Sequence, residues 1–230
     1  MRRRALAWRL FASLALALAL APLRGPGAQP LLEEPSFDEL PLEDVLEIVI
    51  LERELLAVDA RGGGQTRVRL RLAEQVLWTG SRGKIAVALT DQRALAVATG
   101  SAAWQELGWR RVERPPQRAL LGDRVAVLAT GERAIGFDGE SGNLVEAHLG
   151  PGELVLDARA GANAAVVVTD RRALGLSPRR GGFFPASLGA KEQLASVTAG
   201  ANLATVTTDR RLLIFRAPSG SWEERRLDLR

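Results

Sequence analysis

The feature that most constrains this chain is a repeat of about 39 residues. Four similar strings, ALTDQRAL, LATGERAI, VVTDRRAL and VTTDRRLL, have their threonines at Thr90, Thr130, Thr169 and Thr208, spaced by 40, 39 and 39 residues. A step of 39 residues back from Thr90 reaches Leu51, which lies in a fifth and more divergent copy. Because self-similarity at a fixed period indicates repeated structural units, the chain is predicted to hold five of them.

The alignment holds at positions that were not used to find it. Five, seven and nineteen residues after the anchor position, every repeat has an apolar residue. The fifteen residues are Leu56, Leu95, Ile135, Leu174, Leu213, Val58, Val97, Phe137, Leu176, Phe215, Leu70, Trp109, Leu149, Leu188 and Leu227. The five repeats therefore share a pattern of apolar positions, which predicts the same pattern of buried side chains in each unit.

Each repeat has the pattern of four short strands. The second strand, typified by AAVVV at Ala164 to Val168, is apolar on both faces and so must be covered on both sides. A Thr-Asp-Arg-Arg turn leads into the third strand, and the outer strand is the most polar, as in WEERRLDL from Trp222. Aromatic residues on this outer strand, at Trp104, Phe183 and Trp222, are expected to seal one unit against the next.

Four antiparallel strands per unit, with doubly buried middle strands, resemble the blades of a β-propeller. The resemblance implies an all-β fold, a five-bladed β-propeller of four-stranded antiparallel blades, over residues from about Pro35 to Arg230. The Gly-His and Trp-Asp pairs of tryptophan-aspartate repeats are missing, as are the kelch motif and the aromatic array of five-bladed lectins, so no functional residues are transferred. The first strand of the first blade would come from SFDELPL at Ser36, which is acidic and contains Pro41, and closure of the ring is left open.

The first 28 residues have the layout of a secretory signal peptide. Arginines at the start precede fourteen uncharged residues from Leu10 to Leu23, fewer than the about 20 that a spanning helix needs. We therefore expect a signal peptide over 1–28, a five-repeat domain over 29–230, a periplasmic or secreted location and no membrane span after removal of the leader. Because five arginines lie in the leader, its removal changes the net charge from +4 to about −1, which gives no support to a nucleic-acid partner.

The composition also restricts the chemistry. Cysteine is absent and His148 is the single histidine, so thiol catalysis and cysteine-ligated metal sites are excluded. His148 is expected on the solvent side of an outer strand, and one histidine without a partner is poor support for a metal site. No metal and no cofactor are predicted.

The arginines of the repeated turn are the first candidates for binding. Arg93, Arg133, Arg172 and Arg211 share one repeat position, and a closed ring would bring them to one face, where they could bind phosphate, carboxylate or an anionic polymer. The alternative is structural, because Asp91, Asp170 and Asp209 could form Asx-type turns or pair with these arginines.

Two residues depart from the pattern of the inner strands, Trp78 and Asp157. Both are binding candidates, and Asp157 is the one weak candidate for a catalytic carboxylate, with Asp38 or Glu39 as possible companions. Arg159 lies two residues after Asp157 and so faces the same side of the strand, where the two side chains can form an ion pair.

These features favour a noncatalytic exported binding or scaffold module that uses a propeller face for a protein or polymer partner, because no catalytic set is assembled and fold alone does not fix function. One alternative is a lectin-like binder of a small ligand or carbohydrate. The other alternative is a hydrolase that uses the central channel, with Asp157 in its site.

Overall fold

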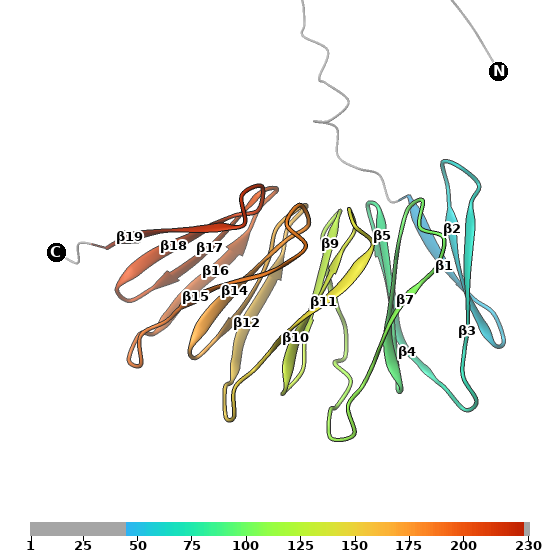
Figure 1. The fold of residues 1–230 in the computed structure, drawn as a ribbon, viewed down its shortest axis with the longest axis horizontal. Helices are drawn as coiled ribbons and strands as arrows, with labels where there is room; N and C mark the ends of the chain where they lie inside the picture. Colours follow the sequence, from blue (N-terminus) through green and yellow to red (C-terminus); the bar gives the residue numbers. More distant parts are fainter. Residues whose placement is uncertain (1–44, 228–230) are drawn as a thin grey trace, which may run out of the picture. The chain divides into compact units, whose positions relative to one another are not determined.

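The computed structural model describes residues 45–227, and its regular structure consists of 19 β-strands in five antiparallel sheets. We call the sheets blades 1 to 5 in chain order (Figure 1). Blade 1 has β1 (Leu46–Ile50), β2 (Glu54–Asp59) and β3 (Gln65–Arg69), and blade 2 has β4 (Val76–Arg82), β5 (Ile85–Thr90), β6 (Arg93–Ala98) and β7 (Gln105–Gly108). Blade 3 has β8 (Leu120–Leu121), β9 (Val125–Ala129), β10 (Arg133–Asp138) and β11 (Asn143–His148). Blade 4 has β12 (Val155–Ala160), β13 (Ala165–Thr169), β14 (Arg172–Ser177) and β15 (Gly182–Ser187), and blade 5 has β16 (Leu194–Ala199), β17 (Leu203–Thr208), β18 (Arg211–Arg216) and β19 (Ser221–Arg226).

Blades 2 to 5 confirm the predicted unit of four antiparallel strands in sequential order. Blade 1 has three strands in the described region, and by the repeat spacing β1 corresponds to the second strand of the other blades. The strand expected at Ser36 lies outside the described residues, as does the expected signal peptide. The part of the chain that is described contains no helix with the length and hydropathy of a membrane-spanning segment.

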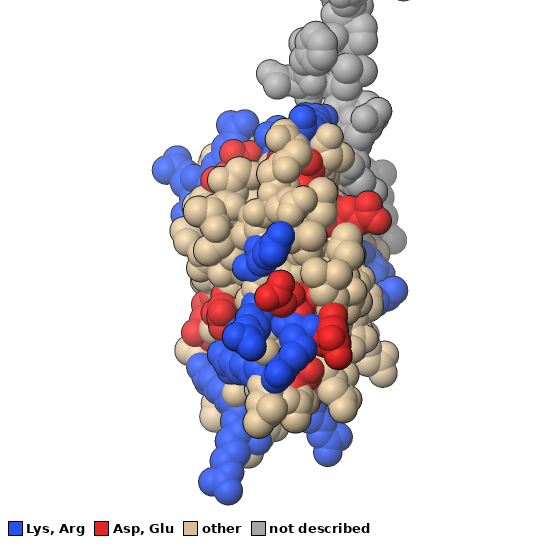
Figure 2. Space-filling view, turned by 90° about the vertical axis from the view of Figure 1, so that its right-hand side faces the viewer, with Lys and Arg blue, Asp and Glu red and all other residues tan. Residues whose placement is uncertain are grey.

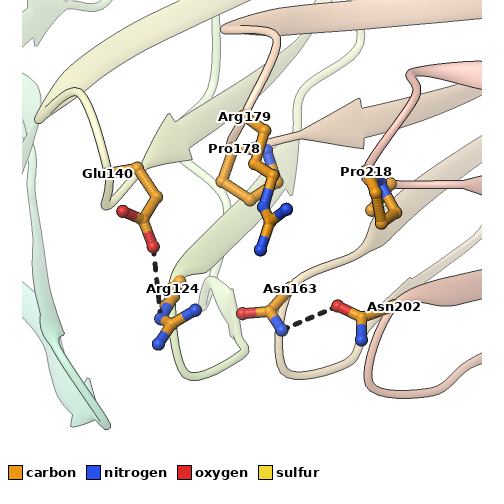
Figure 3. Close-up of a pocket in the computed structure, with 8 residues that line it drawn as sticks. Arg124, Glu140, Asn163, Pro178, Arg179, Asn202 and Pro218 are labelled. Carbon is orange, nitrogen blue, oxygen red and sulfur yellow. Dashed lines mark hydrogen bonds and ion pairs between the residues drawn. The ribbon is translucent and has the colours of Figure 1, made fainter. Parts of the chain in front are cut away.

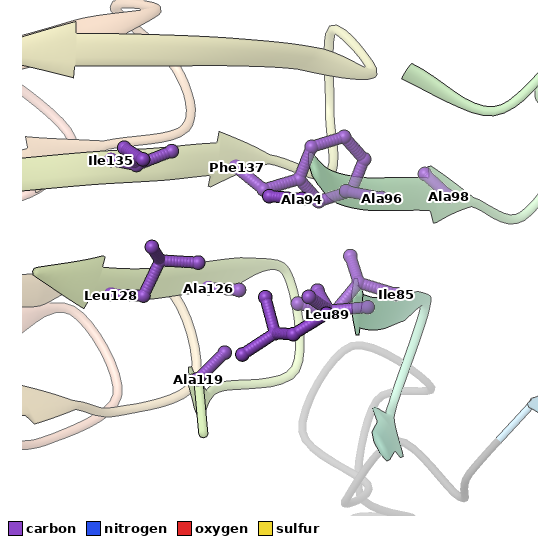
Figure 4. Close-up of a cluster of buried hydrophobic side chains, with 11 residues drawn as sticks. Ile85, Leu89, Ala94, Ala96, Ala98, Ala119, Ala126, Leu128, Ile135 and Phe137 are labelled. Carbon is purple, nitrogen blue, oxygen red and sulfur yellow. The ribbon is translucent and has the colours of Figure 1, made fainter. Parts of the chain in front are cut away.

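The second and third strands of each blade form the core. All residues of β5, β6 and β10 are buried, as are those of β13, because neighbouring sheets cover both of their faces. Figure 4 shows the cluster between blades 2 and 3, in which Leu89 and Ala96 of one blade face Leu128 and Phe137 of the other. The prediction that the second strand is covered on both sides is confirmed for blades 2, 3 and 4, whereas β1 of blade 1 and β17 of blade 5 are buried on one face only.

Small residues in one blade make room for large residues of the next. A Cβ atom on Gly175 would lie 2.5 Å from the Phe215 ring, and one on Gly136 would lie 2.8 Å from Leu176. Such distances are far below van der Waals contact, so each large side chain fills the space left by the missing Cβ of the preceding blade.

Backbone hydrogen bonds also join successive blades, at the turn between the first and second strands. The N–H groups of Val45, Lys84, Arg124 and Asn163 each donate to a carbonyl of the next blade, at Gly83, Asp123, Ala162 and Ala201, over 2.7 to 2.9 Å. Two glycines permit this close approach, because a Cβ on Gly122 or Gly161 would lie less than 2 Å from a carbonyl oxygen of the next blade.

The five blades are stacked face to face in a row, with blade 1 at one end and blade 5 at the other (Figure 1). They belong to one compact unit, Pro41–Arg230. Residues 45–227 thus form an all-β, propeller-like array, in which the first and fifth blades lie at opposite ends.

Replacing Gly175 by alanine tests the interlocking of blades 4 and 5. The added methyl group meets the Phe215 ring, and overpacking of this kind costs about 1–3 kcal/mol of stability. Denaturant unfolding monitored by circular dichroism measures the loss. Gly182→Ala is the matched control, because nothing lies within 4 Å of its Cβ position, and equal stability of the two variants would contradict the packing described here.

Candidate functional site

A buried cluster of threonine, arginine and glutamate side chains occurs beside the repeated turn. In blade 2, Arg93 Nε donates to Glu74 Oε1 over 2.8 Å and Arg93 Nη2 donates to Glu74 Oε2 over 2.9 Å. The Thr90 hydroxyl donates to Glu74 Oε1 over 2.7 Å, and the Arg71 N–H donates to Oε2 over 2.6 Å. The Arg93 and Glu74 side chains are 3% and 0% exposed, so this is a buried ion pair whose carboxylate is saturated with donors.

The same cluster recurs in blades 3, 4 and 5. The Nε to Oε1 distances are 2.9, 2.8 and 2.8 Å for Arg133–Glu113, Arg172–Glu153 and Arg211–Glu192. In each blade the threonine hydroxyl donates to the same glutamate; these are Thr130, Thr169 and Thr208. We call these four arrangements the Thr-Arg-Glu clusters.

Each cluster also binds its blade to the preceding one. Arg93 Nη2 donates to the Arg69 carbonyl over 2.8 Å, and Arg133 Nη2 donates to the Gly108 carbonyl over 2.8 Å. The corresponding groups of Arg172 and Arg211 donate to the carbonyls of His148 and Ser187. The guanidinium group is therefore a link between blades as well as the partner of a carboxylate.

These four arginines are the binding candidates of the repeated turn, and the structure places them inside the clusters. Three of them also donate to a glutamate of their own outer strand; the pairs are Arg93–Glu106, Arg133–Glu146 and Arg211–Glu224. Blade 4 has Pro185 at that position, and Arg172 is the most exposed of the four, at 30%. Most of the hydrogen-bonding capacity of these guanidinium groups is used within the chain.

The glutamates of the clusters were not singled out from the sequence, although a signal exists. Each lies 16 or 17 residues before its threonine; the four are Glu74, Glu113, Glu153 and Glu192. The three aspartates that were considered as Asx-turn residues or as partners of the arginines form no ion pair with Arg93, Arg172 or Arg211, which pair with glutamates. Asp91, Asp170 and Asp209 accept the N–H groups of Gln75, Leu154 and Gln193, which tie the turn to the start of the blade.

The clusters hold the pKa of their glutamates well below the ordinary value. Burial alone would raise the pKa of Glu153, but hydrogen bonds from Arg172, the Gly150 N–H and Thr169 outweigh it and bring the pKa to about 2. The hydrogen bond from Arg211 is the largest influence on Glu192, and its pKa is likewise about 2. The carboxylates therefore stabilise the folded state in their ionised form.

A different group of residues surrounds an open hollow on the inner strands of blades 2, 3 and 4. The hollow has a volume of about 420 Å³ and is lined by Trp78, Ser81, Arg82, Arg118, Ala119, Leu120, Leu121, Ala158, Arg159 and Ala160. Ala119, Leu120 and Leu121 supply its apolar surface, and three arginines come from three successive blades. We call this the inner-edge hollow.

Trp78 is half-buried at one side of the inner-edge hollow. It follows a β-bulge in β4, and its ring covers Gly80, where a Cβ would lie 2.6 Å from Trp78 Cη2. The side chain packs against the core cluster between blades 2 and 3. Its ring is therefore held in place while part of it remains open to solvent.

The three arginines differ in their partners. Arg82 Nε lies 3.0 Å from Asp123 Oδ1, and Arg159 Nη2 lies 3.1 Å from Asp157 Oδ2. Arg118 is exposed, and no described residue forms an ion pair or hydrogen bond with its side chain. Arg82 and Arg159 are each 54% exposed, so all three guanidinium groups can be reached from solvent.

Asp157 follows a β-bulge of β12, as Trp78 does in β4. Its Oδ1 accepts the Ala158 N–H over 2.7 Å, and its Oδ2 takes part in the ion pair with Arg159 that their spacing predicted. These contacts give Asp157 the role of positioning Arg159 beside the inner-edge hollow. Asp38 and Glu39, its possible companions, lie outside the described residues.

A second and narrower cleft lies between the turns of blades 3, 4 and 5 (Figure 3). Arg124 Nε lies 3.2 Å from Glu140 Oε1, and Asn163 Nδ2 donates to Asn202 Oδ1 over 2.9 Å. The volume of the cleft is about 10 Å³, which is close to the minimum for one water molecule. This cleft is too small to hold a ligand.

The remaining singled-out residues lie where the repeat placed them. Trp104 is 6% exposed and donates from Nε1 to the Thr66 carbonyl of blade 1, and Trp222 donates to the Phe184 carbonyl of blade 4, so both seal neighbouring blades as predicted. His148 is exposed on β11 and contacts Arg110. Within residues 45–227, no group of three or more His, Asp or Glu side chains could hold a metal ion.

Comparison with known proteins gives structural matches alone. No family model matches the chain, and no curated protein matches it. Apo AztD from Citrobacter koseri matches with 12% identity and a TM-score of 0.40, over 80% of this chain and 60% of its own. Prp20p from Saccharomyces cerevisiae matches with 8% identity and a TM-score of 0.40, over 76% and 56%, and the N-terminal domain of Nup159 matches with 10% identity and a TM-score of 0.34, over 83% and 63%.

This chain therefore spans less than two thirds of the length of each of these proteins. Similarity at this level carries no inference about what the chain binds or does. The five repeated antiparallel sheets themselves define it as a β-propeller-like repeat protein.

Acidification is expected to destabilise the blades through the clusters. Glu153 and Glu192 have pKa values of about 2 when folded, and an unfolded glutamate titrates near 4.5. Their stabilisation is complete above pH 5 and is lost as the pH falls towards 2, by about 3 kcal/mol for each group at most. Denaturant unfolding between pH 6 and pH 2.5 measures this loss. Glu192→Gln should be less stable at pH 6 and less sensitive to acid, whereas Glu52→Gln, at an exposed position, should keep the pH profile of the unmodified chain.

Proposed function

We propose that this chain is a noncatalytic exported binding module, and that its inner-edge hollow binds an acidic segment of a partner protein. The five sheets serve as propeller-type blades that hold the hollow rigid. The leader-like residues 1–28 support export to the periplasm or the exterior of the cell.

The observation that carries the proposal is the gathering of Arg82, Arg118 and Arg159 around one open hollow. Guanidinium groups bind carboxylates with two parallel hydrogen bonds, and such charge-assisted bonds are stronger than neutral ones. Arg118 has no partner among the described residues, so its donors are available to a ligand. The buried arginines of the Thr-Arg-Glu clusters lack this property.

The apolar part of the hollow supports a peptide as the ligand. Trp78, Leu120 and Leu121 present apolar surface next to the arginines, which suits a segment that alternates acidic and apolar side chains. The volume of about 420 Å³ can hold a few side chains. The inner strands also carry the exposed apolar residues Leu77 and Leu156.

Photo-cross-linking tests the proposal in the native host. A photoreactive amino acid at position 118 should capture a protein, and mass spectrometry should place the link in an acidic segment of it. Arg118→Glu, made in otherwise unmodified protein, should weaken binding of that segment by about 10- to 100-fold, which corresponds to loss of a charged hydrogen bond of about 1.5–3 kcal/mol.

Arg111 provides the matched control, since it is exposed and does not line the hollow. Arg111→Glu makes the same change of charge and should leave binding nearly unchanged. Equal effects of the two variants would mean that binding depends on net charge and not on the hollow. Cross-links to an acidic polysaccharide alone would mean that the partner is not a protein.

A further inference from the structure

The outer face of blade 5 is built like an inter-blade surface but is uncovered. In blade 4, the face that packs on the next blade includes Ala164, Val166 and Val168, all fully buried. By the repeat spacing, the corresponding residues of β17 are Leu203, Thr205 and Thr207, and Leu203 is 42% exposed. The series of packed faces therefore ends in a face that has no neighbour among the described residues.

The outer face of blade 1 is the other free surface of the row. Its residues at the positions that pack on a preceding blade include Val49, Leu51, Leu56 and Val58. Val49 and Leu51 are 38% and 44% exposed. Figure 2 looks onto this end of the row, where an uncharged area adjoins a cluster of Lys, Arg, Asp and Glu side chains.

The two free faces are complementary in the size of their side chains. At the four existing interfaces, a small residue meets a larger one of the next blade; the pairs are Ala57–Val97, Ala96–Phe137, Gly136–Leu176 and Gly175–Phe215. At the same position blade 5 has Ile214, which is larger than the residues of the other blades. Blade 1 has Val58 at the opposite position, so Ile214 would meet a residue smaller than those at three of the four existing interfaces.

Hydrogen bonds at the existing interfaces can also continue between the free faces. Trp104 and Trp222 donate from Nε1 to a carbonyl of the preceding blade's outer strand. Blade 1 has Gln65 at this repeat position, and its side-chain amide can make the same donation to the carbonyl of Glu223 in blade 5. The N–H of Asn202 is next in the ladder of backbone donors and has no acceptor among the described residues.

The charges at the free faces are complementary as well. Where blades 2 to 5 have the arginine of the Thr-Arg-Glu cluster, blade 1 has Glu54. The cluster arginines reach the end of the preceding blade's outer strand, and in blade 5 this strand ends with two exposed arginines, Arg225, which pairs with Glu223, and Arg226. A glutamate of blade 1 would therefore meet arginines of blade 5.

We propose that blade 1 of one copy of this chain packs on blade 5 of a second copy. The contact continues the face-to-face stacking already present between the blades. Within one chain the two faces lie at opposite ends of the row (Figure 1), and bringing them together would require opening interfaces whose side chains are 0–2% exposed, such as those of Val166, Leu213 and Phe215. A second copy needs no such rearrangement.

Because the two faces differ, the contact is head to tail, and each added copy leaves one free face of each kind. The assembly therefore either grows as a chain of copies or closes into a ring made of several chains.

The absence of cysteine from the sequence allows a direct test by disulfide formation. Val58→Cys and Ile214→Cys are made in separate copies of the full chain, mixed, and oxidised gently. We expect a two-chain product linked through positions 58 and 214, because a disulfide forms only when the two Cβ atoms lie about 3.5–4.5 Å apart. Val112→Cys, at a position 77% exposed, replaces Val58→Cys in the control mixture and should give little product.

The double variant in a single chain separates the alternatives. If it forms a bond within the chain while the mixture of single variants gives no two-chain product, the faces close a ring within one copy and the proposal is overturned. Equal yields from the test and control mixtures would also overturn it.

Sedimentation of the unmodified chain gives an independent readout. We expect a mass above that of one chain, which Ile214→Glu should reduce to one chain without loss of the β-sheet circular dichroism signal. Leu72→Glu, at a residue 83% exposed and away from both faces, should keep the larger mass. An unmodified chain that sediments as a single copy at all concentrations would contradict the proposal.

Discussion

The stacking of the blades depends on the hydrogen bonds that the arginine of each Thr-Arg-Glu cluster makes within its own blade and to the preceding blade. A guanidinium group that is almost fully buried must be paired, because an unpaired charge in the interior costs several kcal/mol. Arg93 satisfies this requirement by binding Glu74 of its own blade and the Arg69 carbonyl of the blade before it. The arginine thereby links two sheets, and the same link to the preceding blade recurs at Arg133, Arg172 and Arg211.

The apolar contacts and the polar contacts therefore act at different places on the same interfaces. Interlocked pairs such as Gly175 and Phe215 fill the middle of each interface, whereas the guanidinium and backbone hydrogen bonds lie at its edges. The inner-edge hollow lies beside these contacts and shares Ala119, Trp78 and Leu121 with the apolar cluster between blades 2 and 3, whereas its Arg118 takes no part in them. Surface arginines such as Arg118 are consequently free to differ between blades, while cluster arginines are not.

The sequence predicted the repeat unit, the order of its strands and the burial of its second strand, because all three follow from hydrophobic periodicity. It also predicted that Trp104 and Trp222 seal neighbouring blades.

Hydrophobic periodicity does not reveal side-chain pairs that are 16 or more residues apart. The glutamate partners of the arginines were therefore missed, although their spacing from the threonines is regular. The hollow depends on three segments meeting in space, so only Trp78 of its lining was singled out as a binding candidate; Arg159 was noted only as the neighbour of Asp157. Ring closure depends on the angle between sheets, which a single sequence does not encode in any local pattern.

The arrangement of sheets in a row has a consequence for the dynamics of the molecule. Within a single copy, each interior sheet is held by two neighbours, whereas an end sheet is held by one, so the free energy of opening should decrease from blade 3 towards both ends. Amide hydrogens of β9 and β10 would then exchange with solvent most slowly, and those of blades 1 and 5 would exchange fastest. The inner-edge hollow, carried by blades 2 to 4, occupies the most persistent part of such a row. A binding surface in that position keeps its shape even while the ends of the molecule fluctuate.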